Sequence, residues 1–143
     1  MNSSKLNTDS IHTDIVLIGG GHAHIEVIRN FGMKPEPGTR LTLISKENQT
    51  LYSGMLPGLI ANHYEFDDVH IDLRPLTHFA NCRFFHSEVL AIDLKKNVVL
   101  CDGRPPIPFD LLSLDIGSSP SEVPDGHESI LPVKPINSFY EHF

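Results

Sequence analysis

A change of hydrophobic period within residues 14–32 constrains the fold of this chain more than any other feature. Residues 15–18 form an unbroken apolar run, which is typical of a strand buried on both faces of a parallel sheet. Three glycines follow, and apolar residues then recur at the spacing of one helix face, at Val27, Ile28 and Phe31. We expect Gly32 to cap the end of this helix and residues 40–45 to form a second strand. The pattern predicts a βαβ unit with a right-handed crossover.

The next stretch, residues 46–66, has no steady period and is interrupted by glycines and a proline. It predicts a long irregular loop, and such loops inside compact domains are often functional. Asp72 can cap a short helix whose apolar positions are Leu73, Leu76 and Phe79.

Short β-like runs fill the remainder of the domain. We expect a third parallel strand near residues 84–87, a small β-meander that ends near Pro108, and a fourth core strand near residues 111–116. The predicted fold class is therefore α/β, a Rossmann-like parallel sheet with a small β-meander.

The composition supports one globular domain and limits its partners. The chain has 143 residues, with 18 acidic and 11 basic side chains and a formal net charge of −7. We expect a disordered polar tail over residues 1–12, a domain over residues 13–120, and a linker rich in proline and serine over residues 121–143. The acidic balance disfavours nucleic acids as partners. No apolar run is long enough for a transmembrane segment, and a cytoplasmic location is expected.

The glycine-rich turn between the first strand and the first helix suits a diphosphate. Gly19 permits a tight turn, and Gly21 removes the Cβ that would hold phosphates away from the backbone. The helix N-terminus adds free N–H donors and a partial positive charge. The alternative is a glycine turn without a ligand. The prediction fails if side chains fill this turn or if the first two strands pair antiparallel.

Two positions depart from the dinucleotide-binding pattern. His24 stands where a third glycine is expected, and it shares the apolar stripe of the helix, so it faces the sheet. Our hypothesis is a neutral His24 that packs or donates one hydrogen bond near the diphosphate, and the alternative is a plain spacer. No acid ends the second strand: Ser45 and Lys46 stand there, with Glu47 one residue further on. This arrangement tolerates a phosphate near the ribose, as in NADP, unless Lys46 is simply solvated.

Several ordered motifs together resemble a known family. They are DIVLIGGGHAHIEVIR, LTLIS, YSGMLPG, IDLRPL and FDLLSLDIGS. They resemble the N-terminal FAD-binding half-domain of the pyridine nucleotide-disulfide oxidoreductase and NADH dehydrogenase-like flavoproteins. One branch with GGGHAH and YSGMLPG occurs fused ahead of selenide, water dikinase. In this family, the turn that matches DIG reads ATG.

The resemblance implies a role for each matched stretch. The implied cofactor-binding residues are Gly19, Gly20, Gly21, His22, Ala23 and His24 at the FAD pyrophosphate, Ser45 and Lys46 beside the adenosine ribose, Ser53, Gly54 and Met55 near the isoalloxazine, Val89 at the adenine edge, and Asp115 and Gly117 where the chain passes the cofactor.

The resemblance also implies what kind of enzyme this chain serves. A second glycine fingerprint for NAD(P)H is missing from the chain, so we expect a missing C-terminal NAD(P)H domain and a fragment that is inactive alone. Cys82 and Cys101 are far apart in the sequence and are expected to be buried core thiols, not a redox dithiol. His22 and His24 make a poor metal pair, and no metal ligand or catalytic acid or base is assigned. The alternatives are an NADP-binding Rossmann dehydrogenase and a non-catalytic dinucleotide-binding module.

Overall fold

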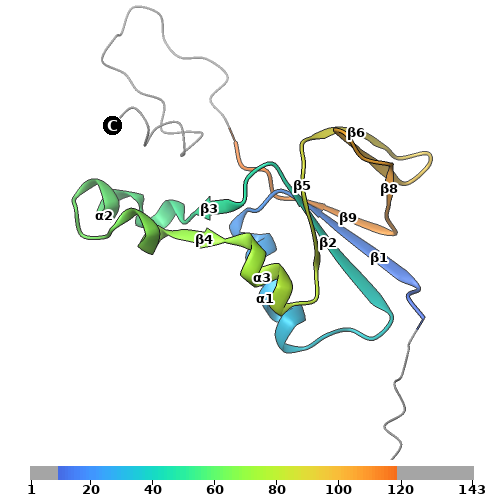
Figure 1. Ribbon diagram of the computed structural model, residues 1–143, viewed down its shortest axis with the longest axis horizontal. Helices are drawn as coiled ribbons and strands as arrows, with labels where there is room; N and C mark the ends of the chain where they lie inside the picture. Colours follow the sequence, from blue (N-terminus) through green and yellow to red (C-terminus); the bar gives the residue numbers. More distant parts are fainter. Residues whose placement is uncertain (1–9, 119–143) are drawn as a thin grey trace, which may run out of the picture.

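A parallel sheet of four strands forms the centre of the molecule (Figure 1). The computed structural model describes residues 10–118. The strands, in spatial order β5-β2-β1-β9, are Arg83–His86, Thr39–Ser45, Thr13–Ile18 and Leu111–Leu114. Each neighbouring pair is parallel. The predicted Rossmann-like parallel sheet is confirmed, and the tails predicted over residues 1–12 and 121–143 lie almost wholly outside the described residues.

Side chains of β1 alternate between two cores because successive residues of a strand point to opposite faces. Leu17 packs with Ile28 of helix α1 (His22–Met33) and Leu73 of helix α3 (Leu73–Phe79). Val16 and Ile18 pack on the other face. Because both faces are covered, these β1 residues are at most 5% exposed, which explains the unbroken apolar run in the sequence.

A small antiparallel meander covers the face of the sheet opposite the helices. It consists of β6 (Val89–Asp93), β7 (Val98–Cys101) and β8 (Ile107–Pro108), as predicted. Cys101 lies in the core beneath the meander, whereas Cys82 lies in the core beneath the helices. Both thiols are free and buried, so the prediction of core cysteines is confirmed.

The stretch predicted as an irregular loop has its own secondary structure. Strands β3 (Gln49–Leu51) and β4 (His70–Asp72) pair antiparallel and form the base of an arm that extends away from the sheet in Figure 1. Between them lie η1, α2 and η2, at Ser53–Met55, Leu56–Ile60 and Phe66–Val69. The prediction of an irregular loop is wrong for this stretch, because the arm has short helices and strands and a small core of its own, made of Leu51, Leu56, Leu59 and Val69.

Two predicted boundaries also need correction. Helix α1 continues through Gly32 to Met33, and its C-cap is Lys34. Gly32 has a packing role instead, because the Phe79 ring of α3 lies where a Cβ on Gly32 would be. The fourth strand ends at Leu114 rather than near residue 116, since the chain turns there to cross the glycine-rich turn. The predicted cap of α3 is confirmed, because Asp72 accepts a hydrogen bond from the Arg74 amide.

Candidate functional site

The glycine-rich turn lies at the carboxyl end of β1 and is held by both neighbouring strands. The Gly19 amide donates to the Ile44 carbonyl at 2.8 Å, and the Asp115 amide donates to the Ile18 carbonyl at 2.8 Å. Gly19 has a φ of +93°, and a Cβ there would collide with the Asp115 main chain. Only glycine fits this position, because the backbone is left-handed and another backbone segment passes against it.

This place in the sheet is a topological switch point. From β1 the chain proceeds to β2 on one side, while β9 lies on the other side. Ligands of open α/β sheets bind in the crevice outside the carboxyl ends of the strands at such a point. The parallel pairing of β1 with β2 satisfies one requirement of the predicted dinucleotide site.

The side chain of Asp115 occupies the N-terminus of α1. Its Oδ2 accepts hydrogen bonds from the amides of Ala23 at 3.0 Å and His24 at 3.3 Å. Its backbone carbonyl accepts the Gly21 amide at 3.2 Å. A Cβ on Gly21 would overlap the same carboxylate. The turn is therefore filled by one side chain, and the donors expected to bind phosphate hold a carboxylate.

The donor set nevertheless suits an anion. A carboxylate on two helix N-terminal amides is a stand-in for a phosphate oxygen, since both exploit the same donors and the same helix dipole. Within residues 10–118, the amides of Gly20 and His22 donate to no protein acceptor. In the conformation described here the Asp115 side chain fills the turn, which is one of the two outcomes that count against the predicted diphosphate site. A diphosphate could use these amides only after that side chain had moved aside.

His22 contributes a second unsatisfied group beside the turn. Its Nε2 atom is buried and has no hydrogen-bond partner among residues 10–118, although a buried polar atom ordinarily has one. The His22 ring meets the ring of Tyr52 edge-on, with 4.6 Å between centroids. Tyr52 therefore links the base of the arm to the turn. No pattern in the sequence indicates this contact, because a ring pair between distant segments has no local signature.

His24 connects the turn to β9. The side chain is 2% exposed, its Nδ1 lies 2.7 Å from the Gly19 carbonyl oxygen, and its Nε2 lies 2.9 Å from Ser113 Oγ. A carbonyl can only accept, so Nδ1 donates, and Nε2 is left to accept the Ser113 hydroxyl proton in the neutral ring. Both nitrogens have protein partners. The inward orientation predicted for His24 is confirmed, and the ring has no donor left for a ligand.

The end of β2 lies next to the glycine turn. Ser45 Oγ is 3.6 Å from the place of a Cβ on Gly20, and it accepts the Glu47 amide at 3.2 Å. The Lys46 side chain is 70% exposed, and its Nζ lies 3.8 Å from a Glu88 carboxylate oxygen. Ser45 is therefore at the turn, whereas Lys46 extends toward solvent.

The other residues implied by the resemblance lie further apart. Ser53, Gly54 and Met55 form η1 in the arm, and Val89 pairs with Cys101 in the meander. Gly117 has a φ of +76° and open space around it, three residues beyond the end of β9. The structure thus gathers the glycines, Ser45 and Asp115 into one site, with the arm on one side of it.

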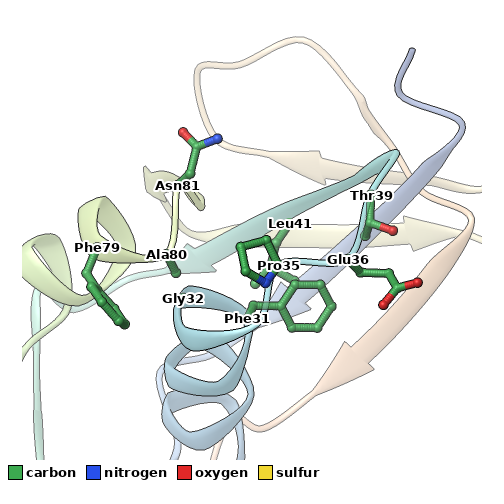
Figure 2. A pocket seen from close by; sticks show the side chains of 9 residues that line it. All are labelled: Phe31, Gly32, Pro35, Glu36, Thr39, Leu41, Phe79, Ala80 and Asn81. Carbon is green, nitrogen blue, oxygen red and sulfur yellow. The ribbon is translucent and has the colours of Figure 1, made fainter. Parts of the chain in front are cut away.

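The pocket shown in Figure 2 is not part of this site. It lies under the C-terminal end of α1, lined by Phe31, Gly32, Pro35, Glu36, Thr39, Leu41, Phe79, Ala80 and Asn81. Thr39 begins β2 and Asn81 precedes β5, so the pocket is at the amino ends of the strands, opposite the glycine turn. Its lining carries one charged group, Glu36, and no nucleophile paired with a base.

The described part of the chain, residues 10–118, has neither a cluster of metal ligands nor a helix that could span a membrane. No group of three or more potential metal-ligating side chains is found in this part of the chain. None of its helices has the length and apolar character needed to cross a membrane.

Several solved oxidoreductases have a fold similar to that of this chain. Sulfide:quinone oxidoreductase from Aquifex aeolicus is 24% identical with a TM-score of 0.68, over 82% of this chain and 27% of that protein. NDH2 from Plasmodium falciparum in complex with NADH is 16% identical with a TM-score of 0.68, over 90% of this chain and 27% of that protein. The fold is the one that these oxidoreductases share. NADH:rubredoxin oxidoreductase from Clostridium acetobutylicum is 19% identical with a TM-score of 0.63, over 82% of this chain and 31% of that protein.

These comparisons bear on the fold and on the extent of the chain. No family model and no curated protein matches the sequence. The chain spans less than a third of the length of each of the three solved proteins. The expected likeness to NADH dehydrogenase-like oxidoreductases is confirmed at the level of the fold.

Proposed function

We propose that this chain is the FAD-binding portion of an NAD(P)H-dependent oxidoreductase. The observation that carries the proposal is the pair of helix N-terminal amides, at Ala23 and His24, that bind an anionic oxygen at the switch point of a parallel sheet. The shared fold with oxidoreductases, one of them in complex with NADH, supports the same function.

In this proposal each group of residues has a binding role. The amides of Gly20 and His22 receive the diphosphate, joined by those of Ala23 and His24 when the Asp115 carboxylate moves aside. Ser45 and Lys46 lie beside the adenosine ribose, and Val89 offers backbone groups to the adenine. The arm residues Ser53, Gly54 and Met55 lie beside the isoalloxazine, and Gly117 lets the chain pass the cofactor. Bound FAD would supply hydride-accepting chemistry, and the protein would bind and orient it.

The site for NAD(P)H and the electron acceptor belong, in this proposal, to a further part of a longer protein. The limited coverage of the solved oxidoreductases supports this division. Leu111 and Leu114 of β9, an edge strand, are each 58% exposed, as expected of an edge that more chain covers. A fused selenide, water dikinase and a cytoplasmic location remain predictions from the sequence.

A second candidate is an NADP-binding Rossmann dehydrogenase. It is favoured by the end of β2, where Ser45 and the exposed Lys46 replace the carboxylate that usually contacts an adenosine ribose. A lysine at this position can meet a 2′-phosphate. The FAD-binding oxidoreductase should bind FAD more tightly than NADP⁺, and the dehydrogenase should show the reverse order.

A binding experiment on the 143-residue chain tests the proposal. FAD is titrated by quenching of its fluorescence, and NADP⁺ by calorimetry, against the wild type and Gly21→Ala. Gly21 has a φ of −69° and a ψ of 171°, so alanine keeps the backbone and places a methyl group in the anion position. The matched control is Ala91→Val, which adds methyl groups to an exposed position of β6.

The outcomes separate the candidates. Binding of FAD that Gly21→Ala weakens at least tenfold and Ala91→Val leaves unchanged supports the proposed function. Tighter binding of NADP⁺ than of FAD supports the dehydrogenase. If the chain binds neither FAD nor NADP⁺, both functions are contradicted. If it binds a nucleotide but the full-length protein shows no turnover, the non-catalytic module is supported.

A further inference from the structure

The carboxylate of Asp115 stands in the place that the proposed diphosphate needs. It accepts the amides of Ala23 and His24, and it fills the space in front of Gly21 that the missing Cβ leaves free. These bonds are charge-assisted and lie on the positive end of a helix of 12 residues, so they stabilise the closed position. A ligand oxygen cannot use the same amides until this carboxylate leaves.

The backbone of Asp115 is held by hydrogen bonds to the turn, whereas within residues 10–118 its carboxylate is held only by the amides of Ala23 and His24. The Asp115 amide donates a hydrogen bond to the Ile18 carbonyl, and the Asp115 carbonyl accepts one from the Gly21 amide. These two bonds hold the main chain of Asp115 against the turn. Its carboxylate has no salt bridge to a lysine or arginine among the described residues. The side chain is only half-buried, and the chain beyond it is exposed, with open space around Gly117. Rotation about the Asp115 Cα–Cβ bond would move the carboxylate without moving the main chain.

We infer that Asp115 is an autoinhibitory residue, whose carboxylate competes with the dinucleotide diphosphate for the N-terminus of α1. The inference rests on the function proposed above. Only molecules in which the turn is clear can bind the dinucleotide. The apparent affinity is therefore the intrinsic affinity multiplied by the fraction of such molecules. A diphosphate can displace the carboxylate because it carries more charge and more acceptor oxygens, and it also reaches the free amides of Gly20 and His22. A ligand without an anionic group cannot displace it.

The experiment compares FAD binding by the 143-residue chain with that of three variants. Asp115→Ala removes the competing group, and Asp115→Asn removes its charge while keeping an oxygen that can cap the helix. The control is Glu36→Ala, which removes one negative charge from an exposed residue at the amino ends of the strands, opposite the glycine turn. Circular dichroism and thermal melting establish that each variant is folded. Amide NMR shifts of Ala23 and His24 report the loss of the carboxylate before FAD is added.

We expect Asp115→Ala to bind FAD about 2- to 30-fold more tightly than the wild type, the range that corresponds to the loss of a helix-capping interaction. Asp115→Asn should give a smaller gain, and Glu36→Ala should bind like the wild type. The inference is overturned if the wild type binds FAD and Asp115→Ala binds it equally or more weakly, while the proposed function survives. If neither the wild type nor any variant binds FAD, the proposed function is wrong and the inference falls with it.

Discussion

His24 stands where the dinucleotide-binding pattern has a glycine, and it stabilises the turn in a different way. A third glycine would let α1 approach the sheet closely. Here the histidine ring fills that space and ties the Gly19 carbonyl to Ser113 of β9. The residue holds the turn in shape through these two bonds, and its ring nitrogens are not available to a ligand.

Replacing His24 should therefore mainly reduce the stability of the fold, because both of its ring nitrogens have hydrogen-bond partners within the protein. We expect His24→Ala to lower the free energy of unfolding by roughly 2 kcal/mol, because it leaves a cavity and removes two hydrogen bonds. Urea denaturation followed by circular dichroism measures the change. His63→Ala is the control, since His63 is an exposed residue of the arm. Equal stability of His24→Ala and the wild type would show that the ring is only a spacer.

The sequence predicts which residues belong to the site better than it predicts how their side chains contact one another. The sequence places Gly19 and Gly21 at the turn because the change of period is local, and it places Asp115 near them by resemblance. It does not reveal that the Asp115 carboxylate sits on α1, because that contact joins residues about 90 positions apart. The orientation of His24 was predictable, since its spacing from the apolar stripe fixes the face it shares.

At the scale of elements, the strands of the sheet were predictable and the arm was not. β1 and β2 are long and buried, so their composition indicates them. β3 and β4 have three residues each, too few to show a period, and they pair with each other across the intervening helices. The sequence wrongly predicts Gly32 as a cap, because a glycine near the end of a helical pattern has the same local signal whatever packs against it.

An ion pair between Asp14 of β1 and Arg40 of β2 makes a pH-dependent contribution to the stability of the fold. The Arg40 guanidinium donates hydrogen bonds of 2.6 and 2.8 Å to Asp14 and holds the pKa of that carboxyl below its usual value of 3.8, assisted by the nearby Arg83. Because the folded-state pKa is the lower one, this contribution is present above the pKa of the unfolded chain. It is lost as the pH falls through the folded-state pKa.

We expect Asp14→Asn to lower the free energy of unfolding by about 1 kcal/mol at pH 7, a value reduced from that of a buried pair because Arg40 is partly exposed. The difference from the wild type should shrink as the pH falls below 3.8 and vanish in strong acid. Urea denaturation between pH 2 and pH 7 measures it, with Asp102→Asn as the control. A difference that is constant across this range would contradict the assignment.

At the scale of the molecule, the sheet separates the two thiols. Cys82 lies in the core beneath the helices and Cys101 in the core beneath the meander. Burial raises the pKa of the Cys82 thiol to about 12 and also raises that of Cys101. Since the thiolate is the reactive form, neither group is suited to redox exchange in the folded protein.

Ellman's reagent tests this arrangement. We expect neither thiol to react with it within minutes at pH 8 in the native protein, and both to react at once in denaturant. Lys95→Cys, on the exposed turn between β6 and β7, provides a thiol that should react immediately and shows that the reagent is active. Rapid labelling of a native cysteine would mean that one of the two cores is open.

The arm carries its own core, and this separation has a consequence for how the molecule opens. Its buried residues contact one another rather than either core of the sheet. A segment with a small separate core and a short ladder opens at a lower free energy than the central strands do. We expect the amide protons of β3 and β4 to exchange with solvent faster than those of β1.

A pair of variants distinguishes a separately opening arm from one that unfolds with the sheet. Leu59→Ala removes a side chain that is 5% exposed in the arm core and should accelerate exchange in β3 and β4 while leaving β1 protected. Val99→Ala, in the core beneath the meander, should instead reduce the protection of β1. Equal loss of protection in β1 from Leu59→Ala would mean that arm and sheet form one cooperative unit. Because the arm reaches the glycine turn through the Tyr52 and His22 rings, independent opening would let the side of the proposed FAD site change shape while its floor stays fixed.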